Sequence, residues 1–168
     1  HMQSVQPEVT CAVYLVASSK RDMPLPKSKS PQSSLSVNLI HQIPLPSPML
    51  PSVNVLGGDL VECSSDPLTG WFRDGCCNTD VNDIGRHTVC CILTDDFLAF
   101  AKSEGNDLIT PAPQFGFPGL VAGDRWCVCA QTWLNAYEQG AACPVDLEST
   151  HELVLEIIDL EQLETHAL

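Results

Sequence analysis

The chain has 168 residues and a net charge of −13, which suits one acidic domain of ordinary size with an additional segment. A chain this acidic would repel a phosphate backbone, so we expect no nucleic-acid partner. Its apolar run at residues 11–17 is far shorter than the roughly 20 residues that a membrane span needs, so we expect no membrane role.

The composition changes near residue 53. Residues 1–53 carry a net charge of +2 and eight of the 13 prolines, whereas residues 54–168 carry −15. Alternating prolines block helices and sheet ladders, so we expect an extended or partly disordered Pro/Ser-rich extension over 1–53 and a compact, acidic, Cys-rich domain over 54–168. The first two residues look like a cloning remnant, and the Ser-rich stretch after them fits a linker or a transit-peptide tail. We expect an intracellular, cytoplasmic protein, or an organellar one if the transit interpretation holds.

Two strand-then-helix units are predicted in the domain. Residues 87–93 are apolar and β-branched, which is typical of a buried strand. Thr94 is a good N-cap for a helix over 95–104 that has acidic residues in its first turn. Residues 125–130 predict a second strand, followed by a helix over 132–139.

Further elements complete the predicted fold. Residues 144–148 and 154–158 predict strands, and residues 160–167 a short terminal helix. Long segments rich in glycine and proline, 66–79 and 105–120, are unusual in a compact domain unless they bind something or pack as ordered loops. We therefore expect an α+β fold: a single compact domain with a small mixed sheet, two to four short helices and long ordered loops.

Six segments closely resemble a mostly bacterial family of uncharacterised proteins, domain of unknown function 2237, over roughly residues 54–167. These segments are 66–70 (Asp-Pro-Leu-Thr-Gly), 73–79 (Arg-Asp-Gly-Cys-Cys-Asn-Thr), 87–90 (His-Thr-Val-Cys), 105–108 (Gly-Asn-Asp-Leu), 115–120 (Phe-Gly-Phe-Pro-Gly-Leu) and 123–130 (Gly-Asp-Arg-Trp-Cys-Val-Cys-Ala). The resemblance implies one compact intracellular domain with no assigned reaction. Cys91 and Cys143 lie outside the family pattern, which makes them poorer site candidates.

The cysteines allow three interpretations. Cys76 and Cys77 lie in a predicted turn, which can present one thiol outward. Cys127 and Cys129 share a face of the predicted strand, but their Cβ atoms would lie roughly 6.6 Å apart. Thiolates around zinc lie roughly 3.8 Å apart, so this pair needs a bulge to chelate. The four cysteines form a metal site, with zinc the candidate ion, or a redox site; alternatively they are buried core residues, or they form disulfides.

Strand alternation argues against another pair. It sends Cys90 and Cys91 to opposite faces, so these two residues cannot bind one ion together.

The three arginines of the acidic domain each have a charged or titratable neighbour: Arg73 and Asp74, Arg86 and His87, and Arg125 and Asp124. One interpretation is that they form ion pairs that tie the loops together. The other is that two or three of them converge on a carboxylate or phosphate, with Trp126 beside them. In such a site Cys76 or Cys77 would be the nucleophile and His87 the base.

Two functions remain open. The first is a small-molecule-binding or metal-binding thiol protein, with a site between residues 73–79 and 124–129. The second is a non-enzymatic acidic scaffold that binds a basic protein partner, its cysteines being structural. Trp71, Trp126 and Trp133 are expected in the core. Phe117 becomes a pocket wall if it is exposed.

Overall fold

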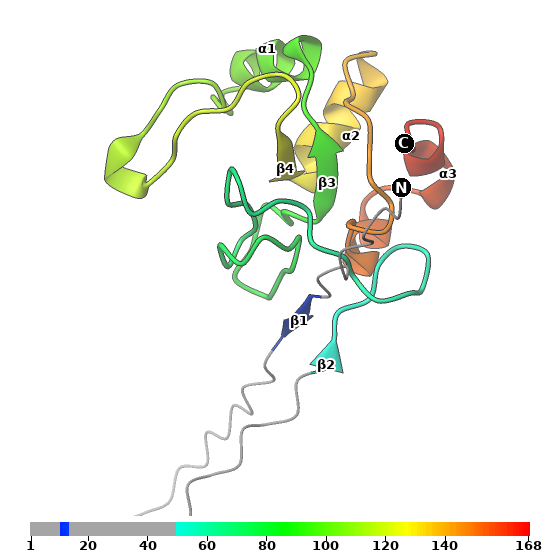
Figure 1. Ribbon diagram of the computed structural model, residues 1–168. Coiled ribbons are helices and arrows are strands. Elements are labelled where there is room, and N and C mark those ends of the chain that lie inside the picture. The colour runs from blue at the N-terminus through cyan, green and yellow to red at the C-terminus, as the bar shows by residue number, and fades with distance from the viewer. Residues whose placement is uncertain (1–10, 14–49) are drawn as a thin grey trace, which may run out of the picture.

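The computed structural model describes residues 11–13 and 50–168. Its centre is the antiparallel pair β3 (Val89–Ile92) and β4 (Arg125–Val128), in which Cys90 lies opposite Cys127. The remaining elements are β1 (Ala12–Val13), β2 (Leu50–Pro51), α1 (Asp95–Ser103), η1 (Pro113–Phe115), α2 (Ala130–Glu138), η2 (Glu152–Glu156) and α3 (Leu160–Glu164). Figure 1 shows α2 beside the β3–β4 pair and the yellow-green loop that carries η1 reaching away from it. The predicted α+β fold is confirmed.

The two predicted strand-then-helix units are confirmed. Thr94 caps α1, since its hydroxyl accepts a hydrogen bond from the backbone N–H of Phe97 at 3.2 Å. α2 begins at Ala130, directly after β4, and buries Trp133. The indole N–H of Trp133 donates to the carbonyl of Cys143 at 3.0 Å, so this large side chain is buried without an unpaired polar atom.

Two predicted strands are wrong. Residues 154–158 belong largely to the 3₁₀-helix η2. Val154 and Ile158 are buried, but Glu156 between them is exposed, whereas a strand would place all three on one face. Residues 144–148 contribute only single bridges, from Val145 to Cys91 and to Ala167. The described central sheet is therefore the two-stranded antiparallel pair, and the predicted terminal helix is confirmed as α3.

Part of the predicted N-terminal extension is attached to the domain. Cys11 is buried, its N–H donates to the carbonyl of Leu60 at 2.7 Å, and its sulfur is bonded to that of Cys76. The adjoining β1 pairs with β2. The expectation of an extended or disordered chain otherwise falls mostly on residues outside those described.

The main core lies between the helices and the β3–β4 pair. Its largest fully buried side chains include Trp133, Phe97, Leu93 and Ile158. In the part of the chain that the structure describes, no helix has the length and apolar character to cross a membrane.

Candidate functional site

A pocket of about 340 Å³ lies where the loop of residues 70–73 meets β4. Aromatic side chains form much of its wall, and a few polar groups lie among them, as is usual for small-molecule sites. Its lining residues are Gly70, Trp71, Arg73, His87, Asp107, Leu108, Phe117, Trp126 and Cys127. The pocket thus adjoins both segments that the sequence suggested, 73–79 and 124–129.

His87 is held by a buried carboxylate. Its Nδ1 lies 2.6 Å from Oδ1 of Asp83, whose side chain is fully buried. The other carboxylate oxygen accepts from the backbone N–H of His87 at 2.8 Å and from the hydroxyl of Thr79 at 3.0 Å. An ionised carboxylate can only accept, so Nδ1 carries the proton of this bond. Nε2 has no hydrogen-bond partner among residues 11–13 and 50–168, and the His87 residue lines the pocket.

The Asp83 contact also explains the local backbone. Asp83 and His87 are four residues apart, joined by a turn in which the N–H of Arg86 donates to the carbonyl of Asp83 at 3.1 Å. The imidazole stacks on Trp71, with ring centroids 5.8 Å apart and planes 15° apart. Trp71 is 42% exposed, so the expectation that it is a core residue is wrong: it is a pocket wall.

Arg73 reaches the pocket from a strained turn. Its φ of 54° is in the left-handed region, which a side chain with a Cβ rarely adopts. The guanidinium carbon lies 5.1 Å from the ring centroid of Trp126, a cation–π contact. Arg73 forms no ion pair within the described residues, so its donors are available to a ligand.

The structure does not bring the three arginines together. Arg125 donates to the carbonyl of Cys63 at 2.7 Å and pairs with Asp146, and it does not line the pocket. Arg86 pairs with Glu156 at 2.9 Å. Of the three, Arg73 lines the pocket, so the ion-pair interpretation holds for the other two.

Asp74 and Asp124, the acidic neighbours of Arg73 and Arg125, accept hydrogen bonds within their own loops. Asp74 accepts from the N–H of Cys76 at 3.0 Å and from the amide of Asn78 at 3.3 Å. Asp124 accepts from the N–H of Val121 at 2.9 Å. Both carboxylates hold loop backbone or loop side chains, and neither lines the pocket.

Asp107 lines the pocket but is already satisfied. Hydrogen bonds from the backbone and hydroxyl of Thr110, and from the backbone of Ile109, hold the pKa of Asp107 well below its usual range. Lys102 lies 3.2 Å from it and offsets its charge. Arg73 and His87 are therefore the charged or titratable pocket side chains with free hydrogen-bonding capacity.

Six cysteines form three disulfides among the described residues: Cys11 with Cys76, Cys63 with Cys90, and Cys77 with Cys127. In this state Cys76 and Cys77 carry no thiol, so neither supplies the nucleophile that the sequence suggested. Disulfides were one of the states that the sequence left open for Cys76, Cys77, Cys127 and Cys129, and three of these four residues are disulfide-bonded.

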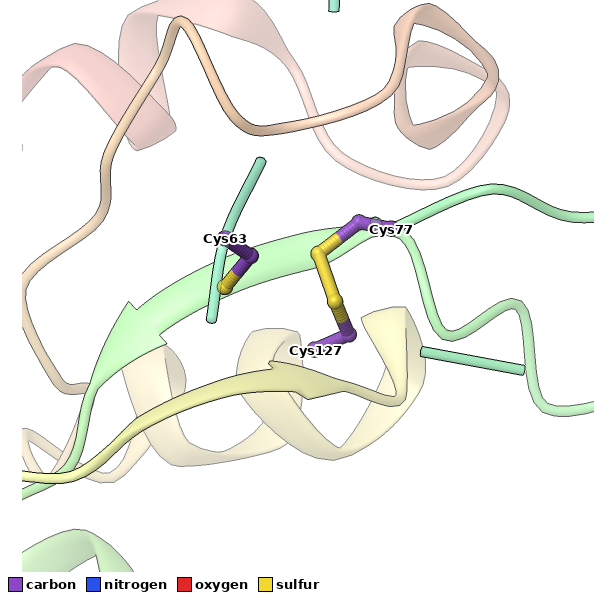
Figure 2. Close-up of side chains that lie close together, drawn as sticks. All are labelled: Cys63, Cys77 and Cys127. Carbon is purple, nitrogen blue, oxygen red and sulfur yellow. A yellow bond between two sulfur atoms is a disulfide. The ribbon is translucent and has the colours of Figure 1, made fainter. Parts of the chain in front are cut away.

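The predicted set of four metal ligands is not assembled. Cys76 is bonded to Cys11, and the thiol of Cys129 donates to the carbonyl of Gly85 at 2.7 Å. The sulfurs of Cys63, Cys77 and Cys127 instead lie within 4.8 Å of one another, as Figure 2 shows. Cys77 and Cys127 keep a place in this buried cluster, and Cys63 is a residue that sequence reasoning missed.

Three cysteines remain as thiols: Cys91, Cys129 and Cys143. Burial raises the pKa of the Cys91 thiol well above its usual range, and its contact with Cys143 raises it further. Cys91 and Cys143 are thus inert core residues, in agreement with their low rank as site candidates.

Comparison with known families assigns this domain. The family described as "Uncharacterized protein conserved in bacteria (DUF2237)" matches residues 53–167. The chain belongs to this family. DUF2237 has no assigned reaction in that description, so the function of this member has to be argued from its site. A search of curated proteins finds no match.

The short segments that carried the family resemblance also supply residues of the pocket. The recognised segments 66–70, 73–79, 115–120 and 123–130 contribute Gly70, Arg73, Phe117, Trp126 and Cys127 to the pocket. The resemblance did not reveal Asp83, which lies between the recognised segments. Its signal was its spacing of four residues from His87.

Proposed function

We propose that this DUF2237 protein binds a small, planar, anionic molecule in the pocket between the Arg73 loop and β4. The observation that carries the proposal is that the two charged or titratable pocket side chains with free capacity, Arg73 and His87, each lie against an aromatic ring in one pocket. The proposal concerns the oxidised chain, in which the disulfides support the pocket wall.

The charge and shape of the pocket support an anionic ligand. The guanidinium of Arg73 is a planar fork that matches a carboxylate or a phosphate. Its position over Trp126 orients the fork without using its donors. The volume of about 340 Å³ is at the low end of the range for small-molecule sites, so a compact ligand fits best.

The wall supports a flat ligand body. Trp71, Phe117 and Trp126 present ring surfaces, and Phe117 packs edge-to-face on Trp126 at 5.7 Å between centroids. A planar aromatic or unsaturated ligand can stack on such surfaces, whereas a strongly hydrated polar one gains little there.

His87 would accept a hydrogen bond or a proton from the ligand at Nε2. Asp83 fixes the proton on Nδ1, the same arrangement by which a carboxylate orients a general base in other sites. Cys127 in the pocket wall offers no thiol nucleophile in the disulfide-bonded state, because it is bonded to Cys77. The proposed activity is therefore ligand binding, in which the ligand can also transfer a proton to Nε2 of His87.

Ligand titrations followed by tryptophan fluorescence test the proposal. Benzoate and phenyl phosphate are the anionic probes, and benzylamine is the cationic counterpart of the same size. We expect saturable binding of an anion and none of benzylamine. Arg73→Gln should weaken the anion by about tenfold to a hundredfold, the worth of one charge-assisted contact.

Arg86→Gln is the matched control. Arg86 is the other described non-glycine residue with positive φ, at 49°, and it pairs with Glu156 outside the pocket lining. It should leave the affinity unchanged. Equal weakening by both substitutions, or binding of benzylamine as tightly as benzoate, would contradict the proposal and favour the acidic scaffold with structural cysteines.

A further inference from the structure

Two disulfides lie side by side beneath the pocket. They join Cys63 to Cys90 and Cys77 to Cys127, and Cys90 and Cys127 are direct partners across the β3–β4 pair. The sulfurs of Cys63, Cys77 and Cys127 lie within 4.8 Å of one another, and the sulfur of Cys90 is bonded to that of Cys63. Figure 2 shows the Cys63 side chain beside the Cys77–Cys127 disulfide. Four cysteine sulfurs from four chain segments thus share one small volume.

We infer that Cys63, Cys77, Cys90 and Cys127 form a zinc-binding site when both disulfides are reduced. A zinc ion with four thiolates holds the sulfurs roughly 3.8 Å apart in a tetrahedron. The non-bonded sulfurs among Cys63, Cys77 and Cys127 are at most 4.8 Å apart and have to approach by about 1 Å or less, while each bonded pair opens. The sulfur of Cys90 lies outside that group of three and has to move further. Movements of this size need side-chain rotations and small loop shifts, without rearranging the β3–β4 pair.

The surroundings suit a structural thiolate site. All four residues are buried, with at most 3% of their surface exposed. Arg125 lies beside the cluster: its Nη2 is 3.6 Å from the sulfur of Cys90, and its Nε donates to the carbonyl of Cys63 at 2.7 Å. A zinc ion with four thiolates has a charge of −2, and the guanidinium, which also pairs with Asp146, would offset part of it. Such outer-shell partners orient and stabilise metal ligands.

The two states of the site exclude each other. A disulfide sulfur is not a thiolate, so the oxidised chain cannot use these atoms as ligands. Reduction by two molecules of a dithiol transfers two electrons and two protons to each disulfide, and each dithiol becomes a disulfide. Zn²⁺ then displaces four protons from the four thiols. Cys127 lines the pocket, so the Cys77–Cys127 bond adjoins it.

This set differs from the ligand set that the sequence suggested. Cys76 and Cys129 leave it, and Cys63 and Cys90 enter. Cys129→Ser is therefore a matched control for Cys90→Ser: Cys129 is two residues from Cys127 and keeps its thiol in the oxidised chain, yet it lies outside the cluster.

Metal titration of the full chain tests the inference. Oxidised protein and protein reduced with a phosphine under anaerobic conditions are each given Zn²⁺, desalted and measured for zinc by mass spectrometry. We expect one zinc per reduced chain and none per oxidised chain. Cys90→Ser should lower the zinc affinity by more than the roughly 10- to 100-fold that losing an outer-shell partner costs, whereas Cys129→Ser should not lower it.

Cobalt substitution keeps the test decisive if a reduced variant does not fold. Co²⁺ in the reduced wild-type chain should give the d–d bands of a tetrahedral ion and a charge-transfer band with the intensity of four cobalt–thiolate bonds. Less than one metal per reduced chain, an octahedral spectrum, or an equal loss in Cys90→Ser and Cys129→Ser would overturn the inference.

Discussion

Replacing Asp83 with asparagine probes the carboxylate that orients His87. The side chain keeps its size but loses its charge and one of its two acceptor oxygens. The amide oxygen can still accept from the N–H of His87 and the hydroxyl of Thr79. The amide nitrogen then faces Nδ1, and it can donate only if the imidazole proton moves to Nε2.

The expected cost follows from the three hydrogen bonds that Asp83 accepts. Each bond to a charged acceptor contributes roughly 1.5–3 kcal/mol and each neutral one roughly 1 kcal/mol, so weakening three of them costs roughly 2–4 kcal/mol. Removing a buried charge recovers part of that loss. We therefore expect Asp83→Asn to lower the free energy of unfolding by about 2 kcal/mol.

Two measurements check this prediction. Urea unfolding of the oxidised protein gives the free energy, and long-range ¹H–¹⁵N NMR of His87 gives the tautomer, which should change from Nδ1–H to Nε2–H. Asp80→Asn is the control, because Asp80 accepts only from N–H groups of its own turn, including those of Asn82 and Asp83. A loss under about 0.5 kcal/mol with an unchanged tautomer would refute our account of Asp83.

Three further changes have expected outcomes. Replacing Cys11 and Cys76 together with alanine opens a link between residues 65 apart, and non-reducing urea unfolding should show a loss of about 2–4 kcal/mol; no loss would mean that the link adds nothing to stability. Thr94→Ala removes the cap of α1 and should cost about 1 kcal/mol in the same assay, against no change if the cap is unimportant. Burial lowers the pKa of His151, so the unfolded chain binds a proton more readily than the folded one. The stability from neutral His151 is therefore present above the ordinary histidine pKa of roughly 6.5 and is lost as the pH falls below it. His151→Asn, which can still accept from the N–H of Leu153, should make stability less dependent on pH between roughly pH 7 and pH 5; an unchanged slope would contradict this assignment.

The sequence predicted the elements whose signals are local. Thr94 before two acidic residues is a complete helix start, and the β-branched run before it packs as β3. The strand prediction over 154–158 is wrong because the apolar residues there are compatible with both the period of a strand and that of a helix. The exposure of Glu156 between the buried Val154 and Ile158, together with the hydrogen bond that His151 accepts from the N–H of Leu153, selects the helical one. That choice depends on tertiary contacts, which sequence pattern alone does not supply.

The candidate site was likewise predicted only in part from the sequence. The loop that carries Arg73 and the strand that carries Trp126 could be placed beside a site, because unusual motif segments mark both. The cysteine pairing could not be predicted, because Cys63 and Cys90 are brought together only by the path of the loops around β3. Alternation within one strand correctly separated Cys90 from Cys91. It could not show that Cys90 lies opposite Cys127 on the neighbouring strand.

A ¹H–¹⁵N NMR titration of the oxidised wild-type protein with benzoate tests the central claim, ligand binding in the pocket, most directly. We predict saturable shifts centred on the indole N–H groups of Trp71 and Trp126, with little change at Trp133 in the core, and their loss in Arg73→Gln. Shifts that do not saturate, or that centre on residues outside the pocket lining, would contradict the claim.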